Sequence, residues 1–205
     1  QTCALPICPS FIVRETEVFS SYYVKLIHEL IKKNASISLL MLCLSGQHEM
    51  VTDFSGFRNF FTLNFIAKPI YNAYILASKL HKSLLDVKVE NENVFVIPTK
   101  NEQGNYSVLL TYSSEKFHDN LPEISEELTF EDKIKDKKVT VYCIDKNTTN
   151  PYRMYEKMGL AADLTKEQIK FLREEGNLKP VAEFDAKEKI NLKLTSNCVY
   201  LVEVK

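Results

Sequence analysis

Tryptophan is absent from this chain of 205 residues, and no two cysteines have the C-x-x-C spacing of a zinc or redox site. The charges nearly cancel, giving a net charge of −1, so the basic surplus that nucleic-acid binding requires is missing. Long apolar runs are also missing, because the best candidate, ISLLMLCL at residues 37–44, is too short to cross a bilayer. We therefore expect a globular protein with no nucleic-acid partner, no membrane span, no cofactor and no metal.

The five cysteines are odd in number, which argues against a disulfide framework in a chain of this size. Cys43, Cys143 and Cys198 each lie in an apolar run. We expect these three to be small buried hydrophobic residues.

Residues 1–13 read as an N-terminal tail. Within it, residues 1–7, QTCALPI, resemble the conceptual translation of a common sequencing-adapter oligonucleotide, which would be a processing artefact. An ordinary terminal tail is the alternative. In the first case we expect the chain to be the C-terminal remnant of a longer protein.

Residues 14–83 have the pattern of α/β structure. Apolar residues at helical spacing predict a helix over 14–33, and a second helix over 70–80 has Pro69 in its first turn. Between them, residues 37–44 are apolar on both faces, which is typical of a parallel strand covered on both sides. The order helix, buried strand, long loop, helix predicts part of an α/β barrel or doubly wound sheet.

From residue 84 to residue 205 the pattern changes to short segments of alternating polarity. We expect an antiparallel β-sandwich here, with Pro98 at a sheet edge or strand end. The predicted strands have the sequences LLDVKVE, NVFVIPT, YSVLLTY, KVTVYCID, KINLKLT and CVYLVEVK. We interpret residues 114–128, SEKFHDNLPEISEEL, as a long polar connection and EDKIKDKKV at 131–139 as an exposed hairpin or loop.

Two helices interrupt this sandwich. Asn150 is placed to cap the first, Pro151 occupies its first position, and Gly159 favours a left-handed stop. In the second, Thr165 and Gln168 have the spacing of a capping box. Arg153, on the first helix, is expected to face water.

The segment KNTTNPYRMYEKMGLAADLTKEQIKFLREEGNLKPV resembles the C-terminal region of glycoside hydrolase family 39, the β-xylosidase and α-L-iduronidase family. The residues that fit its N-x-(W/Y)-R-x-(W/Y)-x-x-M-G helix and the following L-R are Asn150, Tyr152, Arg153, Tyr155, Met158, Gly159, Leu172 and Arg173. Upstream, IAKPIYNAYILASKL resembles the segment that opens barrel helix eight. The resemblance implies the last piece of a TIM (β/α)8 barrel (helix 7, strand 8, helix 8) over residues 14–83, followed by the β-sandwich domain over 84–205.

Members of this family are retaining glycosidases with an acid/base glutamate and a nucleophilic glutamate. The resemblance implies that both positions lie upstream of residue 14, so we expect no catalytic residue in this chain. Glu15 and Glu17 form a tempting pair, but we interpret them as a solvated first helical turn.

What remains of the active site is the rim that follows strand eight, since barrel chemistry gathers at the C-terminal ends of the strands. Here Met41 stands where the family usually has tryptophan and Ser45 where it has aspartate. Glu49 preserves an acid. We name Glu49 and Arg58 as candidate substrate-binding residues, the alternative being ordinary loop charge.

Three interpretations remain open. The chain is a fragment of a glycosidase whose intact parent binds a carbohydrate substrate, a non-catalytic sandwich that binds carbohydrate or a partner chain, or a decayed homologue. The absence of tryptophan disfavours the second, because sugar-binding sandwiches usually display surface aromatic residues. We expect the fragment alone to be inactive; the sequence leaves its oligomeric state open.

Overall fold

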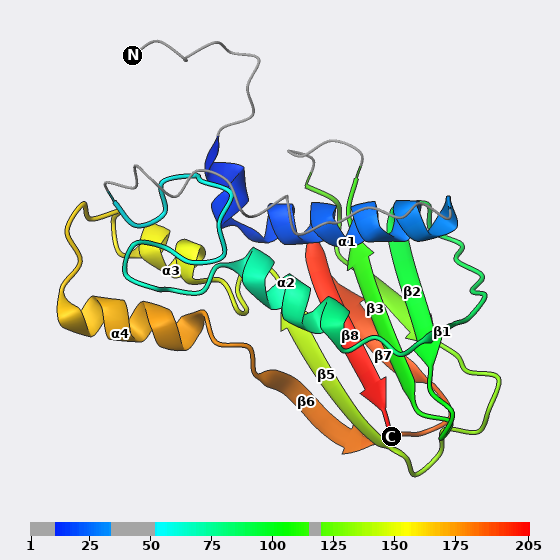
Figure 1. Cartoon of the computed structure of the whole chain (residues 1–205). Coiled ribbons are helices and arrows are strands. Elements are labelled where there is room, and N and C mark those ends of the chain that lie inside the picture. Colours follow the sequence, from blue (N-terminus) through cyan, green and yellow to red (C-terminus); the bar gives the residue numbers. More distant parts are fainter. Residues whose placement is uncertain (1–10, 34–51, 115–119) are drawn as a thin grey trace.

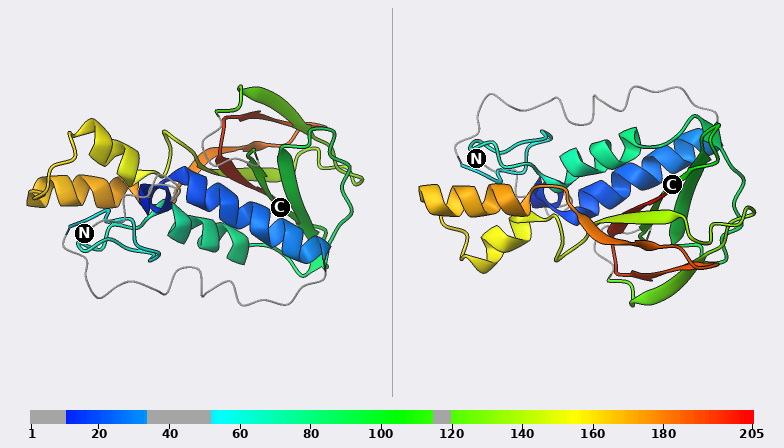
Figure 2. Two further views of the ribbon diagram at one scale, coloured as in Figure 1. Left: turned by 90° about the horizontal axis from the view of Figure 1, so that it is seen from above. Right: turned by 90° about the horizontal axis from the view of Figure 1, so that it is seen from below.

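The computed structural model describes residues 11–33, 52–114 and 120–205. Three layers build the main body: two helices, a six-stranded sheet and a two-stranded sheet (Figure 1). A second pair of helices extends from one end of this body, as the two perpendicular views show (Figure 2). The described part is therefore a mixed α/β structure with antiparallel sheets.

The six-stranded sheet is antiparallel throughout, with the order β1-β2-β3-β8-β5-β6. Its central strands alternate apolar side chains between both faces, since each face is covered. Its strands are β1 (Ser83–Leu84), β2 (Val94–Lys100), β3 (Tyr106–Tyr112), β5 (Lys138–Ile144), β6 (Pro180–Asp185) and β8 (Cys198–Val204). Pro98 lies inside β2, beside a β1 that pairs only with Thr99 and Lys100.

On one face of this sheet lie α1 (Glu17–Lys32), preceded by the 3-10 helix η1 (Phe11–Glu15), and α2 (Pro69–Ser78). The shared core contains Phe19, Tyr23, Val24, Ile70, Ala73 and Leu76 from the helices and Ile97, Leu109, Ile144, Val199 and Leu201 from the strands. Both helices therefore pack their apolar side chains on the sheet, because burial of apolar surface against the strands stabilises the fold.

The opposite face is covered by β4 (Ile124–Leu128) and β7 (Ile190–Leu194), which pair with each other. The two sheets enclose an apolar core, as a sandwich does. β4 lies in the segment interpreted as a polar connection, so that interpretation is wrong for these five residues. β6 was not predicted either, and the segment LLDVKVE contributes only Leu84 to a strand.

α3 (Pro151–Lys157) and α4 (Lys166–Glu175) are the two interrupting helices. The capping residues are confirmed: the Asn150 side chain accepts from the Arg153 amide, and Thr165 and Gln168 form the reciprocal capping box. Gly159 adopts a φ of +86° just beyond α3. Local sequence therefore specifies both helices, as expected from their caps.

Cys143 and Cys198 are buried, as predicted, whereas Cys43 lies outside the described residues. The strand expected over residues 37–44 is also outside them. None of the helices in the described ranges is long and apolar enough to span a membrane.

Candidate functional site

Arg58, one of the two predicted substrate-binding residues, lies exposed in the loop of residues 52–67 that leads into α2. We call this segment the rim loop. Glu49, the other, falls outside the described residues. The rim loop lies at the end of the molecule where η1, α1 and α2 begin and where α3 and α4 project (Figures 1 and 2).

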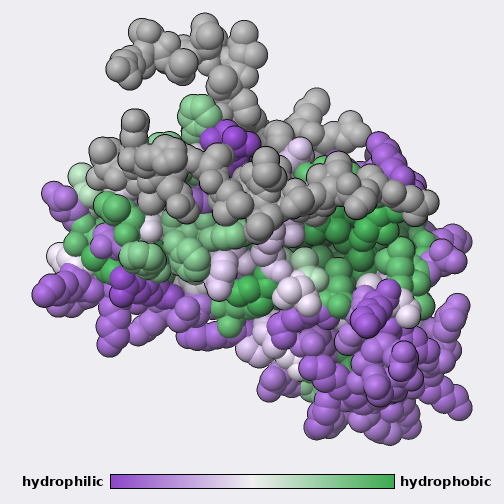
Figure 3. All heavy atoms as spheres, viewed as in Figure 1, coloured by the Kyte–Doolittle hydropathy of each residue, from purple (hydrophilic) through white to green (hydrophobic). Residues whose placement is uncertain are grey.

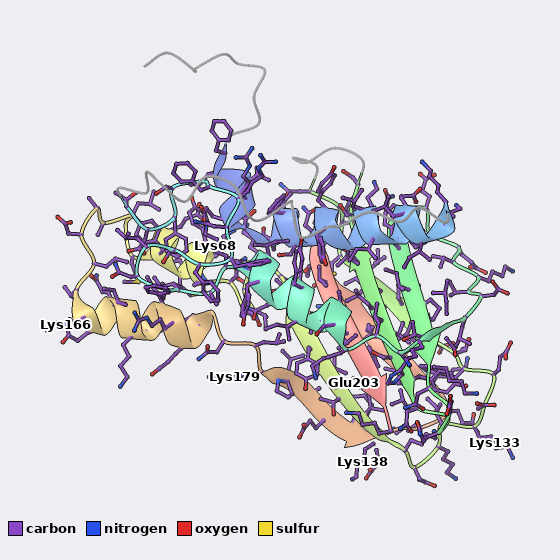
Figure 4. All side chains as sticks on the ribbon, in the orientation of Figure 1. Lys68, Lys133, Lys138, Lys166, Lys179 and Glu203 are labelled. Carbon is purple, nitrogen blue, oxygen red and sulfur yellow. The ribbon has the colours of Figure 1, made fainter. Side chains whose placement is uncertain are left out.

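Glu15 lies at the centre of this end and is fully buried, with 0% of its surface exposed. Its Oε1 accepts hydrogen bonds from the Lys68 Nζ at 2.7 Å and from the Gly56 amide at 2.6 Å. Lys68, also 0% exposed, additionally donates to the Phe57 carbonyl at 3.1 Å. Figure 4 shows Lys68 at the junction of the rim loop and α2. The ion pair thus ties η1 to the Gly56 amide and the Phe57 carbonyl of the rim loop.

Burial raises the pKa of the Glu15 carboxyl above its ordinary value, and the Lys68 ammonium and the Gly56 amide oppose this rise. The second oxygen, Oε2, has no hydrogen-bond partner among the described residues. A carboxylate buried in this way relies on Lys68 for most of its compensation.

Glu17 is also buried, at 4% exposure, and faces a different partner. The Arg153 guanidinium donates to both of its oxygens, from Nη2 at 2.7 Å and Nε at 3.1 Å, and Asn150 Nδ2 donates at 2.8 Å. Arg153 also pairs with Glu156. Burial lowers the pKa of Arg153, but hydrogen bonds to Glu17 and Glu156 outweigh it and raise that pKa. The bidentate contact joins α1 to α3.

These contacts correct two predictions. Glu15 and Glu17 are not a solvated first turn, and Arg153 is half-buried against Glu17 instead of facing water. Thr16, between the two glutamates, caps α1 by accepting from the Val18 amide. The glutamates therefore flank the cap and reach the rim loop and α3, respectively.

The tip of the rim loop is held from two sides. Asp53 accepts from the Asn64 amide at 2.8 Å and from its side chain at 2.7 Å. From α4, Arg173 directs Nε and Nη2 to the Asn64 carbonyl at 3.0 and 2.7 Å. Next to this clamp, Phe65 is 75% exposed and has a φ of +54°.

Aromatic contacts hold the start of the rim loop. Phe54, with a φ of +46°, stacks on Tyr155 at a centroid distance of 4.8 Å and meets the edge of Tyr152 at 5.5 Å. At the end of α4, the Gly176 carbonyl accepts a hydrogen bond from Asn72 Nδ2 of α2 at 2.7 Å. A Cβ at Gly176 would lie 2.6 Å from the Ala67 carbonyl oxygen, so α4 ends in direct backbone contact with the rim loop.

The buried ion pairs and aromatic contacts position the rim loop, and their side chains are not placed to react with a substrate. Glu15 and Glu17 are sealed from solvent and hydrogen-bonded to cations, so neither can reach a glycosidic oxygen or sugar carbon. Groups of histidine, cysteine, aspartate and glutamate able to hold a metal ion are absent from the described ranges. Arg58 is the polar residue of the rim loop that is exposed to solvent.

The comparisons with known proteins identify this arrangement. The model of glycosyl hydrolases family 39 matches residues 8–193. The chain belongs to this family. Since the match includes the rim loop, α3 and α4, these elements are part of the family 39 structure of the chain, and the resemblance found from the sequence is confirmed.

Solved structures agree in fold. A monomeric β-xylosidase from Caulobacter crescentus CB15 superimposes with a TM-score of 0.75 at 17% identity, covering 97% of this chain and 43% of that one. The GH39 enzyme from Xanthomonas axonopodis pv. citri gives 0.72 at 14% identity, with coverages of 95% and 42%. A bacterial orthologue of human α-L-iduronidase gives 0.70 at 16%, with coverages of 93% and 38%.

The chain thus spans about two fifths of the length of these structures. No curated protein sequence matches it. At such identities the structural similarity establishes the fold, and family membership establishes the glycoside hydrolase class.

Sequence analysis missed the buried partners of this end of the molecule. The Lys68-Pro69 motif and Arg153 were recognised as family features, but nothing near them in sequence pointed to Glu15 or Glu17. Lys68 and Glu15 are 53 positions apart, and Arg153 and Glu17 are 136 apart. The one available signal was chemical. If the lysine and arginine of the family motifs are buried, each requires a buried carboxylate as a partner.

Proposed function

We propose that this chain is the C-terminal piece of a retaining glycosidase of the β-xylosidase/α-L-iduronidase type, which hydrolyses terminal glycosidic bonds in its intact form. The observation that carries the proposal is the family 39 match over residues 8–193 of a chain that spans only about two fifths of its structural neighbours. In this proposal the intact protein, and not the 205-residue chain alone, binds the carbohydrate substrate and hydrolyses the glycosidic bond.

In this proposal α1 is barrel helix 7, residues 37–44 are barrel strand 8 and α2 is barrel helix 8. In support, α1 and α2 both begin at the end near α3 and run toward β1 and β2 (Figure 1). Successive helices of a β/α barrel run parallel in this way. We accordingly place residues 14–83 in the barrel and residues 84–205 in the sandwich domain.

In this proposal the rim loop belongs to the catalytic end of the barrel. A loop between a barrel strand and the helix that follows it lies at the C-terminal ends of the strands, where active sites of this fold are found. Glu49 and Arg58 are therefore the proposed substrate contacts, through hydrogen bonds or ion pairing with sugar hydroxyls or a uronate carboxylate. Both catalytic glutamates belong to the upstream part, so the chain alone is inactive.

The test uses two proteins. The 205-residue chain is assayed with 4-nitrophenyl β-xyloside and with a fluorogenic iduronide, and then the same chain is assayed with its upstream coding region restored. We expect no turnover from the first and turnover from the second, lost when either upstream barrel glutamate is changed to glutamine. Turnover by the 205-residue chain that disappears in Glu49→Gln would overturn the assignment.

A non-catalytic module that binds carbohydrate or a partner is the second candidate. One observation favours it: α1 and α2 bury their main apolar faces against the sheet of the same chain. A restored upstream region without two barrel glutamates, together with binding of xylo-oligosaccharides by the 205-residue chain, would select this candidate over the first.

A further inference from the structure

The rim loop holds a strained backbone. Phe54 and Phe65 both have left-handed φ angles, of +46° and +54°, and Gly56 has a φ of +78°. A non-glycine residue in this region costs about 1 kcal/mol or more, and it persists only where surrounding structure determines the conformation. The surroundings of these residues therefore reveal what fixes the loop.

Contacts from α3 and α4 reach Phe54 itself and the residue that precedes Phe65. Phe54 is covered by Tyr152 and Tyr155 of α3. Beside Phe65, whose own ring is mostly exposed, the Asn64 carbonyl is gripped by the Arg173 guanidinium of α4. The helical insertion thus contacts both strained segments, in addition to the hydrogen bonds that Asn64 and Phe65 form within the rim loop.

A second set of contacts, which we call the second route, links α3 to the rim loop through the start of α1. Arg153 and Asn150 fix Glu17, and two residues earlier Glu15 accepts from the Gly56 amide of the rim loop. Lys68 joins this route by contacting Glu15 and the Phe57 carbonyl. The peptide preceding Arg58 is therefore held by Lys68, which pairs with Glu15, two residues before the Glu17 that α3 holds.

We propose that the α3–α4 hairpin is a positioning element for the active-site rim, in which Arg153 and Arg173 hold the rim loop in its strained conformation. This inference rests on the proposed function, because the rim acquires its role from the glycosidase barrel. A loop that is preorganised before the sugar arrives spares the entropy of ordering it on binding. Arg153 and Arg173 act through the loop and do not touch the substrate.

The experiment measures amide hydrogen exchange by NMR on the 205-residue chain, so its outcome is independent of any sugar. Loop reporters are the amides of Gly56, Asn64 and Phe65, which donate to Glu15, Asp53 and the Thr62 carbonyl. The paired amides of β3 and β8 report global opening in the same sample.

The main variant is Arg173→Gln, because Arg173 is exposed and its loss leaves the core intact. We expect exchange of the Asn64 and Phe65 amides to rise about 10- to 100-fold with the β3 and β8 amides unchanged, and Arg173→Lys to give an intermediate rise. Lys170→Gln is the matched control, since it removes the same charge from an exposed position one turn earlier on α4. It should leave all reporters unchanged.

Arg153→Gln tests the second route and should raise exchange at Gly56. Loop amides that stay protected in both variants would overturn the proposal. A rise shared equally by loop and sheet amides would also overturn it, because the arginines would then only stabilise the fold. Failure of the restored enzyme to cleave sugars, with loop exchange as expected, would instead count against the proposed function.

Discussion

Replacing Lys68 by methionine tests the electrostatics of the buried end most directly. Lys68 and Glu15 are both 0% exposed and are joined by a 2.7 Å contact. Lys68→Met leaves a buried carboxylate with the Gly56 amide and only the weaker attraction of Arg14. Removing one partner of a buried ion pair costs about 3–5 kcal/mol. For a chain of this length that corresponds to a fall in Tm of roughly 6–20 °C.

The sign of the pH dependence follows from Glu15. Burial already raises the pKa of this carboxyl, and loss of Lys68 removes the main opposing interaction. Suppose that a carboxyl has a higher pKa in the folded than in the unfolded protein. Its contribution to stability is then fully present below the unfolded pKa, and it is lost as the pH rises through the folded pKa. The destabilisation of Lys68→Met should therefore grow from about pH 4 upward, until the raised pKa is passed.

The control is the double variant Glu15→Gln/Lys68→Met, which keeps an acceptor for the Gly56 amide and removes both charges. Replacing both members of a buried pair by neutral groups is often nearly neutral, so this variant should lie within about 1–2 kcal/mol of the parent and lack the additional pH dependence. Urea unfolding followed by circular dichroism between pH 5 and pH 8 gives the free energies of unfolding. A cost below about 1 kcal/mol for Lys68→Met, or a double variant no more stable than the single one, would refute this reasoning.

Three further predictions concern other parts of the chain. Phe65→Gly should stabilise the protein by about 1 kcal/mol in thermal melts, because glycine adopts the +54° φ without strain and an exposed ring is lost at little cost; a lower Tm would contradict this. Thr165→Ala should cost about 1 kcal/mol and raise exchange in the first turn of α4, as loss of the capping box requires; unchanged exchange there would count against it. Cys143 and Cys198 should resist iodoacetamide at pH 8 until the protein is unfolded, since burial raises the pKa of both thiols, that of Cys198 to about 12; labelling of either in the native state, mapped by mass spectrometry, would show that the strands open.

Elements defined by short-range signals were predictable from the sequence. The caps at Asn150 and Thr165 and the turn around Gly104 lie within a few residues of the groups that they contact. The helix after Pro69 and the strands over β2, β3, β5, β7 and β8 follow from simple periodicity.

Elements determined by distant partners were not predictable. β4 has the sequence ISEEL, in which Glu126 shares the half-buried face with Ile124 and Leu128, and all six residues of β6 are exposed. Neither has enough apolar alternation to be read as a strand. The burial of Glu15 and Glu17 depends on cations from α2 and α3, and a local pattern of charges at a helix start looks the same whether water or such cations surround it.

β6 occupies one edge of the six-stranded sheet, and its outward peptide groups have no strand partner in the described part of the chain. Val181 and Phe184 are exposed there, among the charges of Lys179, Glu183 and Asp185. Hydrophilic residues dominate the lower part of the molecule, where this strand ends (Figure 3). Hydration of such charges keeps open edges from adding foreign strands, because strand addition would remove water from them. The polar residues around Val181 and Phe184 therefore protect an edge whose peptide groups could otherwise pair with a second molecule.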